Sequence, residues 1–175
     1  MPAAPETFRT ARLVAERIGP QHADALIAMN RDERVMCWIH GVATDAETRE
    51  WIVEKASHWD DYGFGHWVLF VAGDADSGPR RFAGRAGLQH CDIDGVDEVE
   101  LLYALQPECW GSGYATEVGK SLLGIAFDRV GLAGVVAYAR LDNQRSRHVI
   151  EKLGFGYERD FAHEGEPYAL YRLIG

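Results

Sequence analysis

One stretch of the sequence decides the fold: Leu101-Leu102-Tyr103-Ala104-Leu105-Gln106-Pro107-Glu108-Cys109-Trp110-Gly111-Ser112-Gly113-Tyr114-Ala115-Thr116-Glu117. It begins as a short apolar strand, turns at a proline, passes two glycines and continues into an amphipathic helix. The first backbone N–H groups of a helix have no partner inside the helix, and the helix dipole favours negative charge beside them. Gly111 and Gly113 have no Cβ, so this backbone can approach a phosphate closely. The stretch therefore predicts a pyrophosphate site.

The length and composition are those of one globular domain. With 175 residues, of which 47% are hydrophobic and 26% charged, the chain can bury a core of its own. We expect a single domain over residues 1–175, with residues 1–10 poorly ordered. No apolar run reaches the roughly 18 residues that cross a bilayer, and the first residues lack the pattern of a signal peptide. We therefore expect a cytoplasmic protein without a membrane partner.

Charge and metal-binding residues narrow the function classes further. The net charge of −9 argues against a nucleic-acid partner, which needs a basic surface, and suits a cationic partner such as an amine. The three cysteines, Cys37, Cys91 and Cys109, lie far apart, and the seven histidines show no metal-ligand spacing. We expect neither a disulfide framework nor a metal site.

Hydrophobic periodicity and turn residues divide the chain into strands and helices. The predicted strands cover residues 12–18, 66–72, 81–91, 98–105, 135–139, 156–163 and 167–173, and the predicted helices cover residues 22–30, 46–62, 114–130 and a segment that ends at 153. Polar turns are expected at Gly73–Pro79 and Asp92–Gly95. The order β-α-α-β-β-β-α-β-α-β-β predicts an α/β fold, with one mixed (α+β) sheet and helices on both of its faces.

Two helix starts carry capping residues. Thr44 or Asp45 is expected to cap the helix over residues 46–62, with Glu47 placed to complete a capping box. Asp142 or Asn143 is expected to cap the last helix.

Four motifs follow one another in the second half of the chain: Glu100-Leu101-Leu102-Tyr103-Ala104-Leu105, Trp110-Gly111-Ser112-Gly113-Tyr114-Ala115-Thr116-Glu117, Asn143-Gln144-Arg145-Ser146 and Lys152-Leu153-Gly154-Phe155. With them the chain resembles the GNAT superfamily of acyl-CoA-dependent N-acyltransferases, and most of all the branch that contains the ribosomal-protein N-acetyltransferases. The resemblance implies a GNAT-like fold with a central, mostly antiparallel sheet. One residue departs from the pattern, because Trp110 stands where the superfamily usually has Gln or Arg.

The resemblance also implies where acetyl-CoA binds. The glycine turn would bind the pyrophosphate, and the strand before it would bind the pantetheine amides and, through one N–H, the thioester oxygen. The implied coenzyme-binding residues are Leu102, Tyr103, Ala104, Leu105, Trp110, Gly111, Ser112, Gly113, Tyr114, Ala115, Asn143 and Ser146. Arg145, Arg147 and Lys152 form a basic patch that either meets the adenosine phosphate or is a solvated helix face. A dinucleotide site is a poor alternative, because Thr116 stands where its third glycine is needed.

Two residues are candidates for catalysis. Glu100 can remove a proton from the attacking amine, a role that the resemblance implies; alternatively it belongs to a solvated acidic cluster with Asp97 and Glu98. Ser146 lies on the sheet-facing side of the last helix, and the resemblance implies that its hydroxyl donates to the departing thiolate. The competing interpretation is that Asn143 caps the helix by accepting the Ser146 N–H, and both roles are compatible for Asn143.

The resemblance implies that the acceptor side is formed between residues 38 and 67. Six side chains there are candidates: Trp38, His40, Trp59, Tyr62, His66 and Trp67. Because tryptophans at helical spacing usually pack in a core, only Trp38 and His40, which lie in a loop, are predicted to contact the acceptor.

Together these features predict an N-acetyltransferase that moves an acetyl group from acetyl-CoA to a primary amine by direct attack in a ternary complex. No cysteine stands in a recognisable nucleophile motif, so no acyl-enzyme is expected. The predicted acceptor is a protein N-terminus, and the alternative is a small-molecule amine: an aminoglycoside, a polyamine or an amino acid. A non-catalytic acyl-CoA-binding module is the alternative from a different class. The acyl chain length stays open, as does the choice between monomer and homodimer.

Overall fold

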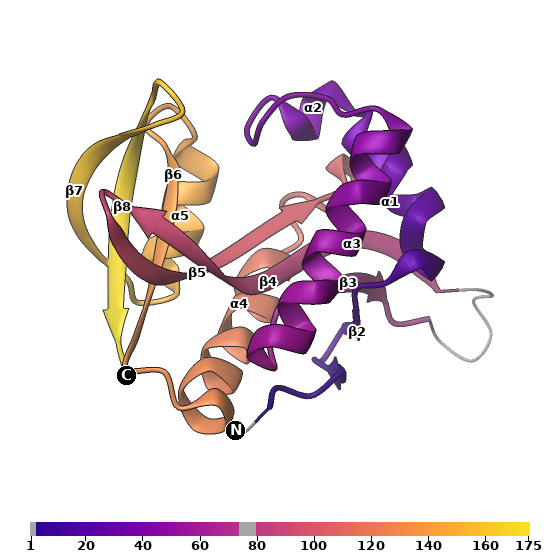
Figure 1. Cartoon of the computed structure of the whole chain (residues 1–175), viewed down its shortest axis with the longest axis horizontal. Helices are drawn as coiled ribbons and strands as arrows, with labels where there is room; N and C mark the ends of the chain where they lie inside the picture. Colours follow the sequence, from indigo (N-terminus) through magenta and orange to yellow (C-terminus); the bar gives the residue numbers. More distant parts are fainter. Residues whose placement is uncertain (1–2, 74–79) are drawn as a thin grey trace.

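The described residues form a single mixed sheet (Figure 1). The computed structural model describes residues 3–73 and 80–175, and within them eight strands follow the order β1-β2-β3-β4-β5-β6-β8-β7. The strands are β1 (Thr7–Arg9), β2 (Leu13–Arg17), β3 (His66–Val71), β4 (Arg81–Ile93), β5 (Val96–Leu105), β6 (Gly134–Arg140), β7 (Gly156–His163) and β8 (Glu166–Ile174). All neighbours in this order are antiparallel except β5 and β6. The predicted mixed, mostly antiparallel sheet is confirmed.

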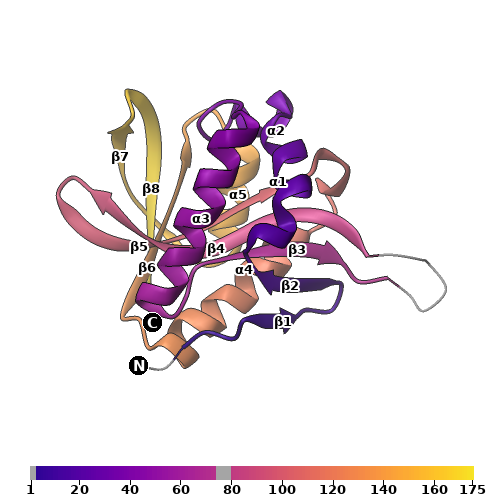
Figure 2. The same ribbon diagram turned by 45° about the vertical axis from the view of Figure 1, so that its right-hand side comes forward.

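Helices cover both faces of the sheet, as predicted. They are α1 (Ala23–Asn30), α2 (Glu33–Met36), α3 (Asp45–Tyr62), α4 (Tyr114–Gly124) and α5 (Gln144–Lys152), and α4 continues as a π-helical turn over Ile125–Val130. Figures 1 and 2 show α1 and α3 in front of the sheet and α4 and α5 behind it. Thr44 caps α3 and completes the capping box with Glu47, and Asn143 caps α5, so each predicted cap lies at one of its two expected positions.

The predicted element order omits two short elements. Strand β1 has three residues, which is too few for a period of two to be recognised, and it is held by pairing with β2. Helix α2 is a single turn that begins where the Asp32 side chain accepts the Arg34 N–H. Strand β4 also extends to Ile93, so the turn predicted at Asp92–Gly95 is shorter than expected. It is a turn centred on Asp94 and Gly95, both at positive φ. Of the turn predicted at Gly73–Pro79, residues 74–79 lie outside the described residues.

Strands β5 and β6 separate in the middle of the sheet. In the described part of the chain a single residue pair, Glu100 opposite Val136, joins them. Beyond this pair β5 stays with β4 while β6 follows β8, and Figure 1 shows the two strands diverging. The edge of β5 that faces β6 therefore has no strand partner from Leu101 to Leu105.

Side-chain alternation assigns the residues of β5 to two faces. Leu101 and Leu105 pack into the main core with Val118 and Leu122 of α4. Glu100 lies on the opposite face, where its side chain accepts hydrogen bonds from Gln89 of β4 and Tyr138 of β6. Helices α4 and α5 approach each other closely at Gly119, where an added Cβ would lie 2.6 Å from a Leu153 methyl carbon. The contact joins the middle of α4 to the C-terminal end of α5, and residues from the starts of both helices line one cavity.

Candidate active site

A cavity of about 1270 Å³ occupies the opening between β5 and β6. All the predicted coenzyme-binding, catalytic and acceptor-contacting residues line it except Ser112, and Arg147 of the predicted basic patch does not line it either. Three groups of residues contribute: Trp38, His40 and Trp51 from the region of α2 and α3; Arg85, Gln89 and Glu100 from β4 and β5; and Gly111, Gly113 and Ser146 from the starts of α4 and α5. The cavity therefore has a side formed by α2 and α3 and a side formed by α4 and α5.

The glycine turn has the geometry of an anion site. Gly111 and Gly113 have φ values of +73° and +80°, a conformation that side chains rarely adopt. Gly113 is the N-cap of α4, and the first helical hydrogen bond runs from the Glu117 N–H to its carbonyl, at 3.0 Å. Among the described residues, the backbone N–H groups from residue 111 to residue 116 have no backbone acceptor. They are available to an anion at the start of α4.

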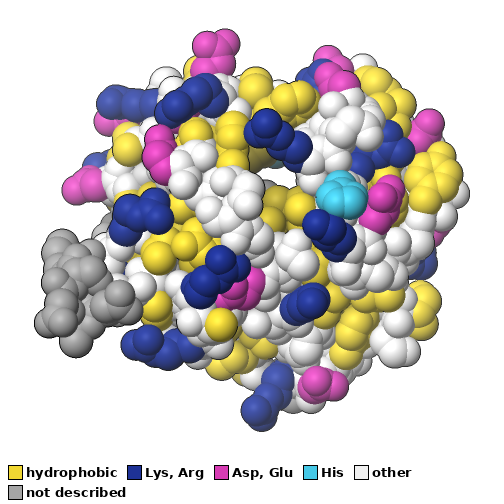
Figure 3. Space-filling view, turned by 180° about the vertical axis from the view of Figure 1, so that it is seen from behind, with side chains coloured by type: hydrophobic (Ala, Val, Ile, Leu, Met, Phe, Trp, Pro, Cys, Tyr) yellow, Lys and Arg dark blue, Asp and Glu magenta, His cyan; other side chains and the backbone are white. Residues whose placement is uncertain are grey.

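Positive side chains surround this end of the cavity. Figure 3 shows the face on which α4 and α5 lie, with Lys and Arg side chains around a hollow. Arg145 and Lys152 line the cavity. Arg147, the third member of the predicted basic patch, instead donates from Nε to the Tyr171 hydroxyl at 2.9 Å and from Nη1 to the Leu141 carbonyl at 3.1 Å. Its role is to hold α5 on β8.

Trp110 links the end of β5 to the start of α5. Its indole N–H donates to the Leu105 carbonyl at 2.8 Å, and the Arg145 guanidinium lies 5.8 Å from its ring centroid. A Gln or Arg at this position could not make both contacts in the same way. Trp110 therefore positions the glycine turn relative to β5 and to Arg145.

A pair of hydroxyl groups lies on the face of β5 that α4 and α5 cover. Tyr103 Oη and Ser146 Oγ are 2.9 Å apart, and the Ser146 N–H donates to Asn143 Oδ1 at 3.1 Å. Burial raises the pKa of Tyr103 to about 12, so this phenol keeps its proton at neutral pH. Asn143 performs the capping that the sequence analysis considered, and it leaves the Ser146 hydroxyl free to bond elsewhere.

Glu100 is a buried carboxylate at the point where β5 and β6 separate. Its Oε2 accepts hydrogen bonds from Gln89 Nε2 at 2.9 Å and from the Tyr138 hydroxyl at 3.1 Å. Burial raises the pKa of Glu100 to about 7, although both hydrogen bonds favour the ionised form. At neutral pH the carboxyl group can therefore both accept and release a proton.

The alternative interpretation of Glu100, a solvated acidic cluster, is wrong. The Glu100 side chain is only 7% exposed. Asp97 lies 3.0 Å from His90 Nδ1, and Glu98 forms an ion pair with Arg172, so both neighbours have partners of their own. Asp97 lies on the opposite face of β5, because alternate residues of a strand face opposite sides, whereas Glu98 shares the face of Glu100 but is held by Arg172.

His66 extends the Glu100 network toward α3. Its Nε2 lies 2.9 Å from Gln89 Oε1, and its ring packs edge-on against Trp51 with 5.4 Å between the centroids. Burial lowers the pKa of His66 to about 3, so the imidazole is neutral and donates this hydrogen bond to Gln89. The Nδ1 atom is buried and has no hydrogen-bond partner. His66 thus fixes the Gln89 amide, whose NH₂ group then faces Glu100.

The sequence analysis did not identify Arg85 and Gln89, and it considered His66 without predicting that it contacts the acceptor, although all three line the cavity. One signal could have found them. In the antiparallel register of β4 and β5, Gln89 lies opposite Glu100 and Arg85 opposite Ala104, and in β3 His66 lies opposite Gly87. Because paired residues share a face, a correct register places all of these side chains beside Glu100.

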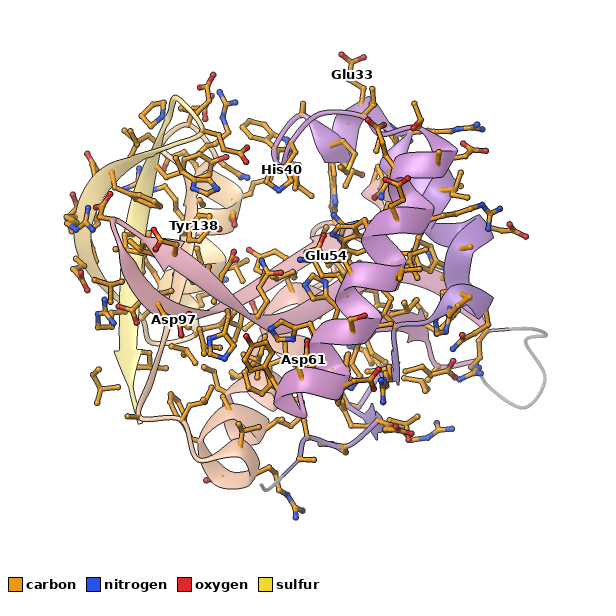
Figure 4. The ribbon with its side chains drawn as sticks, viewed as in Figure 1. Glu33, His40, Glu54, Asp61, Asp97 and Tyr138 are labelled. Carbon is orange, nitrogen blue, oxygen red and sulfur yellow. The ribbon has the colours of Figure 1, made fainter. Side chains whose placement is uncertain are left out.

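Trp38 and His40 lie at the opening of the cavity. Both are in the loop that follows α2, and Trp38 is 38% exposed. His40 Nδ1 lies 3.1 Å from Glu164 Oε2, so this loop contacts the turn between β7 and β8 across the opening (Figure 4). Tyr138 lies on β6, on the far side of the opening (Figure 4). Trp59 and Trp67, which were expected in the core, are both buried.

Two further observations concern the described residues alone. Over residues 3–73 and 80–175, no cluster of three or more His, Cys, Asp and Glu side chains is arranged as a metal site. In the same ranges, none of the helices combines the length and the apolar character that a membrane span needs.

A family profile described as the acetyltransferase (GNAT) domain matches residues 12–156. The chain belongs to the GNAT acetyltransferases. As a member of this family it is an acetyl-CoA-dependent N-acetyltransferase, and the GNAT fold inferred from the four sequence motifs is confirmed.

Two curated relatives illustrate how varied this family is. The GNAT chain is 28% identical to the uncharacterized protein YkkB of Bacillus subtilis over 140 residues, which cover 80% of this chain and 78% of YkkB. It is 25% identical over 174 residues to an FsC-acetyl coenzyme A-N(2)-transacetylase of Aspergillus fumigatus, covering 90% of this chain and 68% of that protein.

Solved structures share the GNAT fold along nearly the whole chain. An acetyltransferase from Agrobacterium tumefaciens superposes with a TM-score of 0.82 at 21% identity, covering 98% of this chain and 96% of that one. RimL, a ribosomal L7/L12 alpha-N-protein acetyltransferase in complex with coenzyme A, superposes with a TM-score of 0.78 at 17% identity. The match covers 97% of this chain and 98% of that one. At these identities the similarity concerns the fold.

Proposed function

We propose that the enzyme acetylates a primary amine by direct attack on bound acetyl-CoA in a ternary complex. The observation that carries this proposal is the buried Glu100 carboxyl group, with a pKa raised to about 7, in a cavity that the hydroxyl pair of Tyr103 and Ser146 also lines. A base and an acid thus border the cavity from the two faces of β5, and the thioester would lie between them.

The coenzyme would bind on the side formed by α4 and α5. The free N–H groups of the glycine turn would hold its pyrophosphate, and Arg145 and Lys152 provide positive charge nearby. The unpaired edge of β5 beyond Glu100 would bind the pantetheine amides as an additional strand does. An N–H group on that edge would stabilise the oxyanion of the tetrahedral intermediate.

The proposed reaction transfers one proton at each end of the thioester. The amine nitrogen bonds to the carbonyl carbon while its proton passes to Glu100, directly or through water. The C–S bond then breaks with its electron pair on sulfur. The thiolate takes a proton from the hydroxyl pair, which solvent replenishes, and Glu100 releases its proton to solvent. The products are the N-acetylated amine and coenzyme A.

The cysteines support direct attack over an acyl-enzyme. Burial raises the pKa of Cys91 to about 12, far from that of a reactive thiolate. Cys109 is buried, and its Sγ lies 3.4 Å from Arg81 Nη1 rather than beside a histidine. Cys37 is exposed on the loop after α2.

The acceptor belongs to one of two classes, and both have named relatives. RimL is described as a protein N-terminal acetyltransferase and the fungal relative as a transacetylase of FsC. A panel of peptide N-termini, lysine peptides, polyamines, aminoglycosides and amino acids, scored by thiol release from acetyl-CoA, distinguishes them. Turnover of any amine, lowered about 100-fold in Glu100→Gln, supports the proposal. If acetyl-CoA raises Tm while no amine releases thiol, the chain is a non-catalytic acyl-CoA-binding module and the proposal is overturned.

A further inference from the structure

Arg85 is a buried guanidinium on the acceptor side of the cavity. It lies on β4, is 5% exposed and lines the cavity on the face of the sheet that α1 and α3 cover. Burial lowers the pKa of Arg85 to about 10, so the group stays positively charged at neutral pH. It is a fixed positive charge in a protected place.

The contacts of Arg85 in the described residues are all neutral. Nη1 donates to Asn30 Oδ1 at 2.7 Å, and Cζ lies 4.3 Å from the Trp51 ring centroid. The Asn30 amide is itself oriented by donating to Thr48 Oγ1 at 3.2 Å, so its oxygen is directed at the guanidinium. A guanidinium has five N–H donors, and most of those of Arg85 are left without a partner among the described residues.

This arrangement is unusual for a chain with 27 acidic and 18 Lys and Arg residues. The more exposed Arg17 and Arg172 each contact two carboxylates. Arg85, which is more deeply buried, has no carboxylate within ion-pair distance in the described residues. A buried charge is normally paired, and a guanidinium pairs best with a planar, bidentate anion. A ligand carboxylate would supply the missing partner.

A chain of contacts connects Arg85 to Glu100. Trp51 touches both the Arg85 guanidinium and the His66 ring; His66 is bonded to Gln89, and Gln89 to Glu100. Arg85 and Gln89 also share one face of β4, with about 14 Å between their Cα atoms in an extended strand. Trp51 contacts both the Arg85 guanidinium and the His66 ring, and Arg85 and Glu100 line the same cavity, so one ligand can meet both groups.

We propose that the acceptor is a small primary amine that carries a carboxylate, such as an amino acid, and that Arg85 binds this carboxylate. This inference rests on the proposed function, in which Glu100 takes the proton of the attacking amine. A compact acceptor fits better than a protein N-terminus, because Arg85 lies beneath Trp51 and is almost inaccessible. The product would be an N-acetylated amino acid, formed together with coenzyme A.

The test compares each amino acid with the amine that lacks only its carboxylate. The pairs are histidine and histamine, tryptophan and tryptamine, lysine and cadaverine, and ornithine and putrescine, measured by thiol release from acetyl-CoA. In wild type, kcat/KM for the preferred pair should be about 10- to 100-fold higher with the carboxylate, as expected for a charge-assisted hydrogen-bonded pair. In Arg85→Gln this preference should vanish, so that kcat/KM becomes equal for the two members of the pair, and Arg85→Lys should restore part of the preference.

Arg34→Gln is the matched control. Arg34 also lines the cavity but forms its own ion pair with Asp32 at 2.6 Å, so its loss should leave the preference intact. The Tm of Arg85→Gln and its rise with acetyl-CoA report whether this variant is folded. If it is not, the comparison of amino acid and amine in wild type still tests the inference. Equal use of both members of every pair overturns the inference while acetyl transfer stands. Preference for peptides that begin with Asp or Glu also overturns it. Absence of thiol release with every amine instead overturns the proposed function.

Discussion

Glu100 Oε2 lies 3.1 Å from the Tyr138 hydroxyl, and this hydrogen bond joins β5 to β6 at the point where the two strands separate. The parallel ladder between them ends after one residue pair, so the sheet opens directly beside a buried carboxylate. A base placed there is reached from the cavity yet shielded from bulk solvent. The separation of the strands thus creates the coenzyme-binding edge and positions the proposed base in one step.

The raised pKa of Glu100 predicts the pH dependence of the reaction. The base must be ionised, so kcat/KM should rise with pH and level off above about 7. Glu100→Gln keeps the shape of the side chain and a hydrogen-bond acceptor for the Tyr138 hydroxyl, but it removes the base. It should therefore lower kcat/KM at pH 8 by about 100-fold. Its remaining profile should follow only the ionisation of the amine. A variant that retains the wild-type inflection near pH 7 would show that another group is the base.

The same carboxyl group predicts a pH dependence of stability. Glu100 has a pKa of about 7 when folded and near 4.5 when exposed, so the folded state binds the proton more tightly. The protonated Glu100 carboxyl group therefore contributes to the free energy of unfolding. This contribution is fully present below pH 4.5 and is lost as pH rises to 7, which lowers the free energy of unfolding by about 3 kcal/mol. Denaturant unfolding at pH 5 and pH 8 should show this loss in wild type relative to Glu100→Gln. Equal changes in both proteins would contradict it.

The hydroxyl pair predicts an effect on turnover without an effect on folding. Ser146→Ala should lower kcat about 10-fold, and the double variant with Tyr103→Phe about 100-fold, because the departing thiolate loses its proton donors. Acetyl-CoA affinity and Tm should change little, since the Ser146 backbone N–H that caps α5 is kept.

Asn143→Ala is the control for this pair. It removes the cap and should cost about 1 kcal/mol of stability while kcat stays within a few-fold of wild type. If the double variant of Ser146 and Tyr103 keeps the wild-type kcat, the departing thiolate does not need these hydroxyl groups as proton donors, and the assignment is refuted.

Variants of two glycines distinguish an effect on coenzyme binding from the cost of backbone strain. Gly111 and Gly131 have φ values of +73° and +79°, and an added Cβ would meet nothing within 4 Å at either position. Changing either one to Ala should therefore cost about 1 kcal/mol of stability. Only Gly111→Ala should also raise the Kd for coenzyme A in calorimetric titration, by about 10-fold, because Gly111 belongs to the proposed anion site. Equal Kd values for the two variants would argue against pyrophosphate binding there.

The residues that line the cavity on the side of α4 and α5 could be predicted from the sequence because their signals are local. Gly111, Gly113 and Asn143 each belong to a short motif whose conformation the neighbouring residues determine. The acceptor side could not be predicted in this way. Arg85 and His66 become neighbours of Glu100 only through the register of three strands and the packing of α3, which no local pattern encodes.

Net charge could not predict the charge of the cavity, for a related reason. The total of −9 suggested a cationic partner, but it averages over the whole surface. The cavity is lined by Arg85 and Lys55 on the acceptor side and by Arg145 and Lys152 on the coenzyme side. Local charge in a cavity, which depends on the fold, is what a ligand meets.

Trp110 provides the last prediction, because sequence comparison left its role open. Trp110→Phe keeps a ring for Arg145 but removes the N–H that donates to the Leu105 carbonyl. We expect a loss of about 1 kcal/mol of stability and a KM for acetyl-CoA that rises about 3- to 10-fold, because the glycine turn loses its tie to β5. Steady-state kinetics with each substrate varied in turn measures both effects.

Trp38→Phe is the matched control for Trp110. The two tryptophans line the same cavity and are almost equally exposed, at 38% and 37%, but Trp38 lies at the acceptor opening. Its variant should change the KM for the amine and leave that for acetyl-CoA unaltered. If both variants shift the same KM, the two sides of the cavity do not bind separate substrates. If Trp110→Phe lowers stability alone, the indole supports the fold and not the coenzyme, and the absence of Gln or Arg at this position has no consequence for binding.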